Sequence, residues 1–175
     1  MRLRSGISID SSQHKKFEQV LENLLQKAPA KFILLTDVSG QVVSACGPSS
    51  QFDLIALGSV MAGGLSAAQE VAQMLGGEQE YQLVLHEGLS ANTFMAGAGP
   101  DFAILVQLDK SVPLGWARML IQEAAKKIDD NCQESDYQES SDAEQIPDAK
   151  KLDLLGDPTN LSDQIGDSLD ALWKG

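Results

Sequence analysis

The sequence predicts an α+β fold in which helices pack on a largely antiparallel, five-stranded sheet. Three observations lead to this prediction: apolar residues recur with helical spacing in three segments, five short β-rich runs lie between those segments, and tight turns join most successive strands. The expected order of elements is α-β-β-α-β-β-β-α. Because 43% of the 175 residues are hydrophobic but only 5% are aromatic, we expect an aliphatic core in one domain with an appendage, or two very small domains.

The first helix is expected over residues 10–27. Asp10 together with Gln13 resembles a capping box that would start it, and Ala28-Pro29 would end it. Its apolar side chains fall on one face at helical spacing: Phe17, Val20, Leu21, Leu24 and Leu25. This face should pack on the sheet.

A hairpin should follow the first helix. The β-rich runs 32–36 and 41–45 flank the turn Asp37-Val38-Ser39-Gly40, in which Gly40 would supply a positive φ. Three more strands are expected over residues 81–86, 91–96 and 102–108. The last helix should start near Ser111, with Pro113 in its first turn, and end at about Ile128. Its apolar face would consist of Leu114, Ala117, Ile121, Ala124 and Ile128.

Most of the net charge of −12 lies in the C-terminal part of the chain, because residues 129–175 carry 13 acidic and 3 basic residues. We expect an acidic, mostly disordered tail here, with a polar linker over residues 131–149. A short amphipathic helix is expected near residues 160–173, with Leu161, Ile165, Leu169, Leu172 and Trp173 at helical spacing. Nucleic acid is not expected as a partner, because the tail would repel backbone phosphates.

We identify no catalytic, cofactor-binding or metal-binding residues. The string Gly166-Asp167-Ser168-Leu169 matches the GDSL string of some esterases, but no histidine follows it to act as a base. The glycine-rich stretch 97–101 is interpreted as a hairpin rather than a phosphate loop. Glu78 and Glu80 are interpreted as solvated loop residues, and His86 as an ordinary strand-edge histidine.

The cysteines and the hydropathy favour a cytoplasmic protein. Cys46 and Cys132 are the only cysteines, and neither lies in a recognisable metal-ligand cluster with His14 or His86. We expect no apolar run to approach the roughly 18 to 20 residues that span a bilayer, so direct membrane insertion is not expected.

The second helix is expected over residues 52–75, ended by Gly76-Gly77, and it carries two glycines near its middle. Its bulky face, which should pack on the sheet, consists of Leu57, Met61, Leu65, Ala68 and Leu75. A neighbouring face has only small residues and one valine: Ala56, Ser59, Val60, Gly63 and Ala67. We expect this small face to pack against the same helix of a second copy. The alternative is that Gly63-Gly64 serves a crossing or kink inside one chain.

This ordered set of features resembles the roadblock/dynein light chain family, including its bacterial MglB-like, GTPase-activating members. The resemblance covers roughly residues 10–128. It rests on FILLTDVSGQVVSACG, the small-residue helix FDLIALGSVMAGGLSAAQEVAQML, and the strands YQLVLHEG and TFMAGAGPDFAILVQLD.

The resemblance implies a profilin-like sandwich with helices on both faces of the sheet. It also implies a homodimer in which edge strands join, which adds Tyr81, Leu83 and Leu85 to the expected interface. The partner it implies is a small Ras-like GTPase. Such an activator rearranges the GTPase's own switch residues and needs no catalytic residue of its own.

Three functions remain open at this point. The first is a homodimeric regulator that stimulates GTP hydrolysis, and the second is a non-catalytic scaffold that recruits a GTPase or motor complex. The third is a small-molecule sensor, which the few aromatic residues of the meander make the weakest. The C-terminal apolar residues, with Trp173 as an anchor, either dock on the GTPase or fold back on the chain's own domain.

Overall fold

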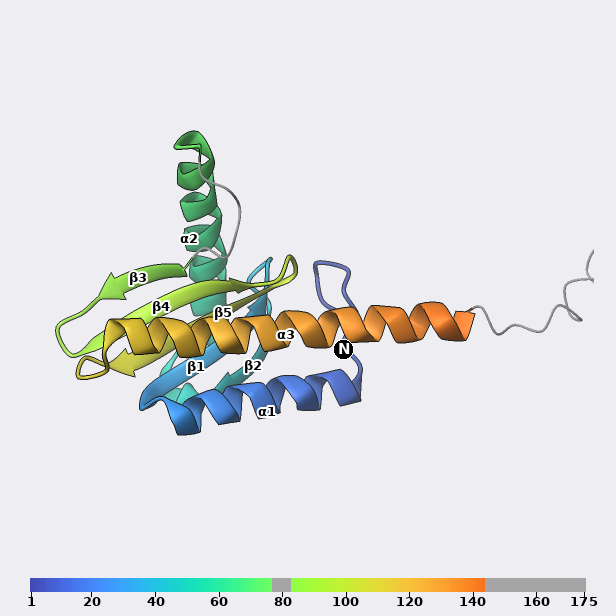
Figure 1. Cartoon of the computed structure of the whole chain (residues 1–175), viewed down its shortest axis with the longest axis horizontal. Helices are drawn as coiled ribbons and strands as arrows, with labels where there is room; N and C mark the ends of the chain where they lie inside the picture. The colour runs from blue at the N-terminus through green and yellow to red at the C-terminus, as the bar shows by residue number, and fades with distance from the viewer. Residues whose placement is uncertain (77–82, 144–175) are drawn as a thin grey trace, which may run out of the picture. The chain divides into compact units, whose positions relative to one another are not determined.

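One antiparallel sheet forms the centre of the fold (Figure 1). The strands lie in the order β2-β1-β5-β4-β3, so that β2 and β3 are the two edges. Their bounds are β1 (Ala30–Asp37), β2 (Val42–Cys46), β3 (Leu83–Glu87), β4 (Ala91–Ala98) and β5 (Phe102–Asp109). The computed structural model describes residues 1–76 and 83–143, and side chains only as far as residue 133.

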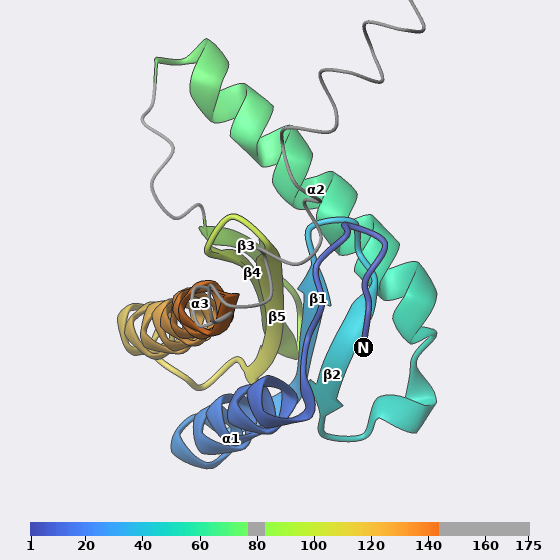
Figure 2. The same cartoon turned by 90° about the vertical axis from the view of Figure 1, so that its right-hand side faces the viewer.

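Helices cover both faces of this sheet (Figure 2). They are α1 (Ser11–Lys27), α2 (Leu54–Met74) and α3 (Leu114–Ala143), with a short 3₁₀ helix η1 (Ser49–Gln51) before α2. Helices α1 and α3 share one face, and α2 lies across the other. The predicted α+β sandwich and its order of elements are therefore confirmed.

Short polar contacts set the ends of the first two helices. The Asp10 side chain accepts a hydrogen bond from the Gln13 amide at 2.7 Å and caps α1, as predicted. Asp53 caps α2 in the same way by accepting from the Ala56 amide at 3.1 Å. Gly76, with a φ of 74°, adopts the expected left-handed conformation just after α2.

The β1–β2 turn is organised by a buried carboxylate. Asp37 accepts hydrogen bonds from the Ser39 hydroxyl at 2.7 Å and from the Gln41 amide at 2.8 Å. Burial opposes ionisation, but these hydrogen bonds outweigh it and hold the pKa of Asp37 below its ordinary value. Gly40 closes the turn with a φ of 85°, as predicted.

The two faces of the sheet bury cores of very different size. The core under α1 and α3 is extensive and includes Phe17, Leu21, Phe102, Ile121 and Ile128. The core under α2 is small and consists of Phe32, Leu34, Met61, Leu65, Met95, Ala103 and Leu105. The α2 side therefore buries much less apolar surface than the α1/α3 side.

The first nine residues contribute to the larger core, which the sequence did not predict. Leu3 and Ile9 are almost completely buried in it. Arg2 forms an isolated antiparallel bridge to Ser8, so the segment doubles back on itself. The segment has no periodic pattern that would have indicated this.

The last helix is longer than predicted. It does not end at about Ile128 but continues to Ala143, through the first part of the expected linker. Cys132 packs against the larger core, and its thiol donates to the Ile128 carbonyl at 3.1 Å. Because neither glycine nor proline occurs between residues 129 and 143, a helix that is already nucleated can propagate.

Two residues expected on buried faces are exposed. Leu75 lies just past the last residue of α2 and is 82% exposed, and Leu114 at the start of α3 is 41% exposed. Each stands at the end of a helix, where fewer neighbours surround it. The remaining bulky members of the two predicted faces are buried or half-buried.

The expectation that no segment is apolar enough to span a membrane was wrong. Among the described residues, α2 alone is long and apolar enough by length and composition, with a mean hydropathy of 1.3 over its best window. Only 17% of that window is buried. Helix α2 therefore exposes an unusual amount of apolar surface.

Candidate protein-interaction surface

The outward face of α2 is an uncovered apolar surface in the described part of the chain. All five residues predicted to lie there are exposed: Ala56, Ser59, Val60, Gly63 and Ala67. Val60 is 71% exposed, and Ile55 near the start of the helix is 73% exposed. Nothing within residues 1–76 and 83–133 covers this stripe.

The two central glycines of α2 are not required for a close approach within the described part of the chain. A Cβ added at Gly63 would meet no atom within 4 Å, and one at Gly64 would make only ordinary contact with Met95 at 3.6 Å. The alternative that these glycines serve an intramolecular crossing therefore finds no support. Among the described residues, a side chain at either position would meet no obstacle.

A different glycine, Gly58, provides the close approach inside the chain. A Cβ at this position would lie 2.3 Å from the carbonyl oxygen of Gly40 in the β1–β2 turn. The reciprocal Cβ at Gly40 would lie 2.6 Å from the Gly58 carbonyl oxygen. Together with the buried Met61 and Leu65, this backbone contact holds α2 on the sheet. Sequence reasoning missed Gly58 because its partner is distant in the chain.

The exposed stripe is longer than predicted. Val71, at 56% exposure, and Met74, at 82%, continue it toward the end of α2. With Ala56, Val60, Gly63 and Ala67 they recur at intervals of three or four residues, which places them on one helix face. The spacing of Val71 and Met74 is visible in the sequence, but the predicted face included only small residues and Val60.

The second expected part of the interface is strand β3. It is an edge strand, as expected, so one side of its backbone has no partner strand within the sheet. Leu83 and Leu85 are half-buried and pack against the core of their own chain. Their side chains therefore attach the strand to the core of its own chain. The outer backbone edge of β3 has no neighbouring strand in the described sheet. Tyr81 lies outside the described residues.

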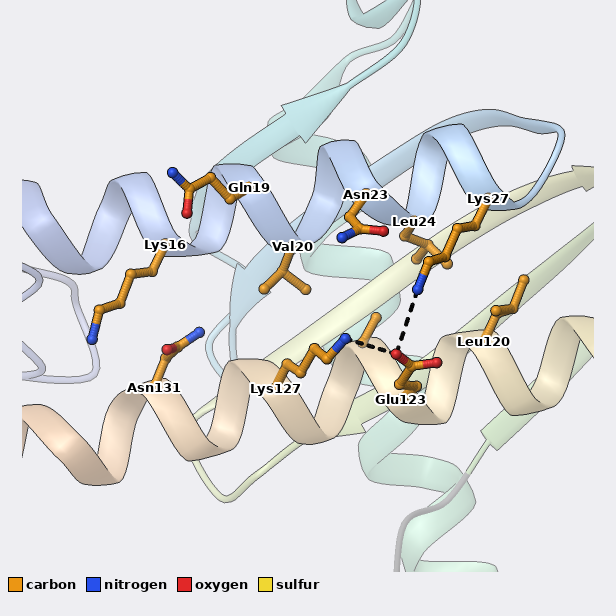
Figure 3. A pocket seen from close by; sticks show the side chains of 11 residues that line it. Lys16, Gln19, Val20, Asn23, Leu24, Lys27, Leu120, Glu123, Lys127 and Asn131 are labelled. Carbon is orange, nitrogen blue, oxygen red and sulfur yellow. Dashed lines mark hydrogen bonds and ion pairs between the residues drawn. The ribbon is translucent and has the colours of Figure 1, made fainter.

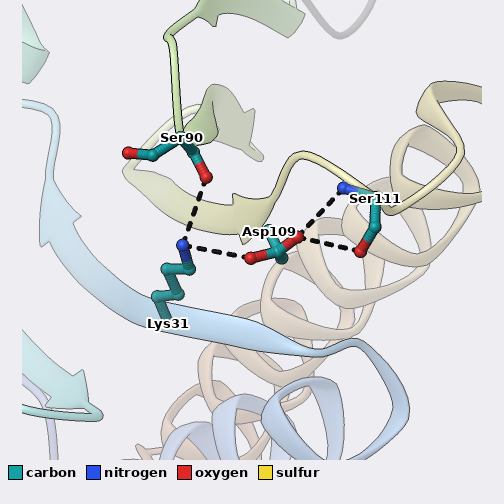
Figure 4. Close-up of polar contacts among 4 residues, drawn as sticks. All are labelled: Lys31, Ser90, Asp109 and Ser111. Carbon is teal, nitrogen blue, oxygen red and sulfur yellow. Dashed lines mark hydrogen bonds and ion pairs between the residues drawn. The ribbon is translucent and has the colours of Figure 1, made fainter.

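The turn that follows β3 is fixed by polar contacts (Figure 4). The Lys31 ammonium donates to the Ser90 carbonyl at 3.2 Å and pairs with Asp109 at 3.1 Å. Asp109 also accepts from the Ser111 amide at 3.0 Å and its hydroxyl at 2.8 Å. These contacts join β1, the β3–β4 turn, the end of β5 and the loop before α3.

The described residues considered for catalysis or metal binding do not form a common site. Among the described residues, no group of three or more His, Cys, Asp or Glu side chains could hold a metal ion. Gly97 and Ala98 end β4, and residues 99–101 form the turn to β5, which confirms the predicted hairpin. His86 is exposed on β3, and Cys46 is half-buried in β2, where burial, followed by Glu22 and Glu18, raises the pKa of its thiol.

Several predicted residues lie outside the described residues. They are Glu78, Glu80 and the apolar tail residues Leu161, Ile165, Leu169, Leu172 and Trp173. The surface that the structure presents is therefore the α2 stripe with the neighbouring edge strand. Its chemistry suits binding of another protein, because it is apolar and exposed.

Comparison with known proteins agrees with this fold. The Roadblock/LC7 domain matches residues 16–108, while no curated protein matches the chain. MglB of Myxococcus xanthus has a similar structure, with a TM-score of 0.67 and 26% identity over 73% of this chain and 96% of that one.

Two further structures have the same fold. The gliding protein MglB of Thermus thermophilus gives a TM-score of 0.66 at 23% identity, and an MglB solved in a tetrameric arrangement gives 0.66 at 24%. Each comparison covers 73% of this chain and 96% of the other. The family match spans more than half of the sequence, and the chain belongs to the Roadblock/LC7 domain family.

Proposed function

We propose that this chain is a homodimeric regulatory platform that binds a Ras-like small GTPase and stimulates its GTP hydrolysis. The platform acts by rearranging the switch residues of the GTPase and contributes no catalytic residue of its own. The observation that carries the proposal is the uncovered apolar stripe on α2, from Ala56 to Met74. Membership of the Roadblock/LC7 family supports a small GTPase as the class of partner.

The stripe suits a second copy of α2 better than most other partners. Gly63 at its middle leaves open space, so a facing helix can approach closely, while Val60 and Val71 on either side offer bulk to pack against. A two-fold axis near Gly63 between antiparallel helices would place Val60 of each copy opposite the small residues Ser66 and Ala67 of the other. One surface thus supplies both halves of the contact.

Strand β3 would extend the same assembly. Because its outer backbone edge is open, the β3 strands of two copies can pair and continue the sheet. The half-buried Leu83 and Leu85 keep the strand on its own core, so pairing needs little rearrangement. The α2 stripe would provide apolar burial and the strand would provide hydrogen bonds.

A membrane is the competing explanation for so apolar a helix. The contact between Gly58 and Gly40 and the buried Met61 and Leu65 argue against it, because they hold α2 on the sheet. A helix fixed in this way can present one face to a surface but cannot leave the domain to span a bilayer. Flotation with lipid vesicles tests this, and binding in proportion to lipid would favour the membrane.

The function is tested by single-turnover GTP hydrolysis of the cognate small GTPase with increasing amounts of this protein. The proposal predicts that the hydrolysis rate rises with concentration and that Gly63→Leu reduces the rise. Binding without any change in rate would favour a scaffold instead. A GTPase encoded next to this gene is the first candidate to assay.

A further inference from the structure

The turn between β3 and β4 presents a leucine to solvent. Leu89 is 99% exposed, the largest value among the exposed large hydrophobic residues that the structure describes. Tight turns are normally built from Gly, Asn, Asp, Ser or Pro, because these residues suit the backbone of a turn. Turn geometry therefore gives no reason for a leucine at this tip.

The backbone of this turn is tied down from three sides. The Gly88 amide donates to the Ala91 carbonyl at 3.0 Å, and a Cβ at Gly88 would lie 2.5 Å from that oxygen. The Lys31 ammonium donates to the Ser90 carbonyl, as Figure 4 shows, and the Lys110 ammonium donates to the Gly88 carbonyl at 3.3 Å. These contacts join the turn to β1 and to the end of β5, so the exposed side chain at its tip is held in place.

Further exposed apolar side chains lie at the same end of the domain. Leu114, Trp116 and Met119, in the first two turns of α3, are all exposed. The loop that leads into α3 is bonded to the β3–β4 turn through Lys110, and the turn projects past the first turn of α3 (Figure 1). Together with Leu89, these side chains form an apolar surface on a projecting end of the domain.

This end is basic, although the chain as a whole carries a net charge of −12. It is formed by residues 27–31, 87–91 and 109–118, which together contain four basic and two acidic residues. The basic residues are Lys27, Lys31, Lys110 and Arg118, and the acidic residues are Glu87 and Asp109. The hydrogen bond of Lys110 goes to a neutral carbonyl, which leaves its charge uncompensated by that contact, and Arg118 is exposed.

The charge of Lys27 is partly compensated within the domain. Its ammonium pairs with the Glu123 carboxylate at 3.6 Å, and Lys127 pairs with the same carboxylate at 2.7 Å (Figure 3). These pairs lie at a groove of about 360 Å³ between α1 and α3, which Lys16 also lines. The basic character that an outside surface would meet therefore rests mainly on the residues beside the β3–β4 turn.

The opposite end of the same sheet is acidic. Residues 10–13, 37–41, 99–101 and 129–133 contain five aspartates and no basic residue, and residues 1–9 add two arginines. A strand of eight residues separates the two ends by about 26 Å, roughly three Debye lengths at physiological salt. An anionic surface would therefore interact mainly with the nearer end and would attract the basic one.

This combination fits a lipid surface. Tryptophan is enriched at membrane–water interfaces, and apolar side chains flanked by Lys or Arg anchor proteins there. A projecting tip can enter a fluid lipid layer, whereas a protein partner would need a matching pocket. We propose that this end of the domain is a peripheral contact site for an anionic lipid surface. Leu89 enters the layer, and Lys110 and Arg118 lie near the lipid phosphates.

The lipid contact goes beyond the proposed GTPase function and does not rest on it. The β3–β4 turn and the start of α3 are not part of the α2 stripe. A monomeric chain, or a chain without effect on GTP hydrolysis, could make the same contact. The contact is peripheral, so it requires no segment that spans the bilayer.

Flotation of the full chain with lipid vesicles tests the proposal. Vesicles of phosphatidylcholine with roughly one-third phosphatidylserine should bind the protein, and vesicles of phosphatidylcholine alone should not. Higher salt should weaken the binding, because it screens the charge of the lipid. Insertion of α2 would not require anionic lipid. Equal binding to both kinds of vesicle, or binding to neither, would overturn the proposal.

A substitution at the tip of the turn identifies the surface. Because Leu89 is fully exposed, Leu89→Ser should leave the fold intact, and loss of its apolar contact should weaken vesicle binding by about tenfold. The matched control is Leu75→Ser, which removes a leucine that is 82% exposed just past α2 and should leave binding unchanged. Binding that depends on Leu75 and not on Leu89 would assign the lipid contact to α2 and overturn the proposal.

Charge substitutions test the basic residues. Lys110→Gln with Arg118→Gln should weaken binding by roughly 25-fold, because each basic residue near an anionic leaflet contributes about fivefold. The matched control is Arg4→Gln with Lys15→Gln, which removes the same charge toward the other end and should leave binding unchanged. Lys110→Arg with Arg118→Lys keeps both charges and should bind like the wild type. A loss in either of these two variants as large as in the first would contradict the role of local charge.

The fluorescence of Trp116 reports the contact directly. Trp173→Phe leaves Trp116 as the only tryptophan, and brominated lipid in the anionic vesicles should quench it. Absence of quenching would overturn the proposal even if the protein floats. An acidic protein partner is the remaining alternative. Binding of polyglutamate that Leu89→Ser weakens, without binding of anionic vesicles, would assign the site to a protein and refute the lipid contact.

Discussion

The two faces of the sheet differ in how much apolar surface the chain itself buries on them. The core under α1 and α3 lies between the two helices and the sheet. It contains long aliphatic side chains and the Phe17–Phe102 ring pair, whose centroids are 5.3 Å apart. Under α2, a smaller core is closed by a helix whose outer face is itself apolar. The first face is covered by two helices of the same chain, whereas α2 leaves apolar residues such as Val60 and Met74 exposed.

This difference separates residues that hold the fold from residues that the proposed dimer would use. Gly58 and Gly63 stand five positions apart on the same helix and illustrate it. At Gly58 a side chain would collide with the β1–β2 turn, whereas at Gly63 it would meet open space. Changes in the first class should alter unfolding, and changes in the second should alter assembly.

The largest effect should come from the complete face. Phe17 is fully buried between α1 and the sheet, and Phe17→Ala should lower the free energy of unfolding by about 3 to 5 kcal/mol. Urea denaturation measures it. A loss below about 1 kcal/mol would mean that this core tolerates a cavity and is less well packed than the structure indicates.

The contrast within α2 is next in size. Gly58→Ala should cost about 1 to 3 kcal/mol, because the new Cβ forces α2 away from the backbone of Gly40. Gly63→Ala is the matched control and should stabilise the helix by up to about 1 kcal/mol through its higher helix propensity. Thermal unfolding of both variants measures the two changes in stability. Equal changes would contradict the claim that only Gly58 is needed for close packing inside the chain.

The buried carboxylate of the β1–β2 turn should make the α2 side sensitive to acid. Asp37→Ala leaves the Gln41 amide and Ser39 hydroxyl without their acceptor and should cost about 1 to 3 kcal/mol at neutral pH. Because the folded-state pKa is lowered, the contribution is present above pH 3.8 and is lost as pH falls through the folded-state value. Denaturation at pH 7 and pH 3 should therefore show a smaller difference between wild type and variant at the lower pH.

The smallest effect concerns the exposed polar cluster at the end of the sheet. Hydrogen bonds from the Ser111 amide and hydroxyl, followed by Lys31, lower the pKa of Asp109 to about 2. Lys31→Met should raise that pKa toward 3.8, and Ser111→Ala should raise it through loss of the hydroxyl hydrogen bond. An NMR titration of the Asp109 carboxyl measures both shifts, and an unchanged pKa in the two variants would contradict the contacts.

Most of the fold was predictable because it follows from local patterns. Helical spacing, a β-rich alternation and turn residues such as Gly40 each leave a signal within a few positions of one another. The end of α3 was not predictable in the same way. Residues 129–143 are polar, which suggested a linker, yet they lack the glycine or proline that would stop a helix.

Contacts between distant segments were the part that the sequence could not provide. Nothing near Gly58 indicates that Gly40 lies against it, and nothing near Lys16 indicates that Lys127 lines the same groove. The exposed α2 face was predictable in part, since the small residues from Ala56 to Ala67 form a helical stripe. Its continuation to Met74 follows the same spacing, but only the structure shows that Val71 and Met74 are exposed.

The central claim is that the α2 stripe is an interface between two copies, and the mass of the chain in solution tests it most directly. Multi-angle light scattering at micromolar concentration should give a dimer for the wild type and a monomer for Gly63→Leu. Gly115→Leu is the matched control, because that glycine in α3 also faces open space but lies away from α2, and it should remain dimeric. A monomeric wild type, or a dimer that persists in Gly63→Leu, would contradict the claim.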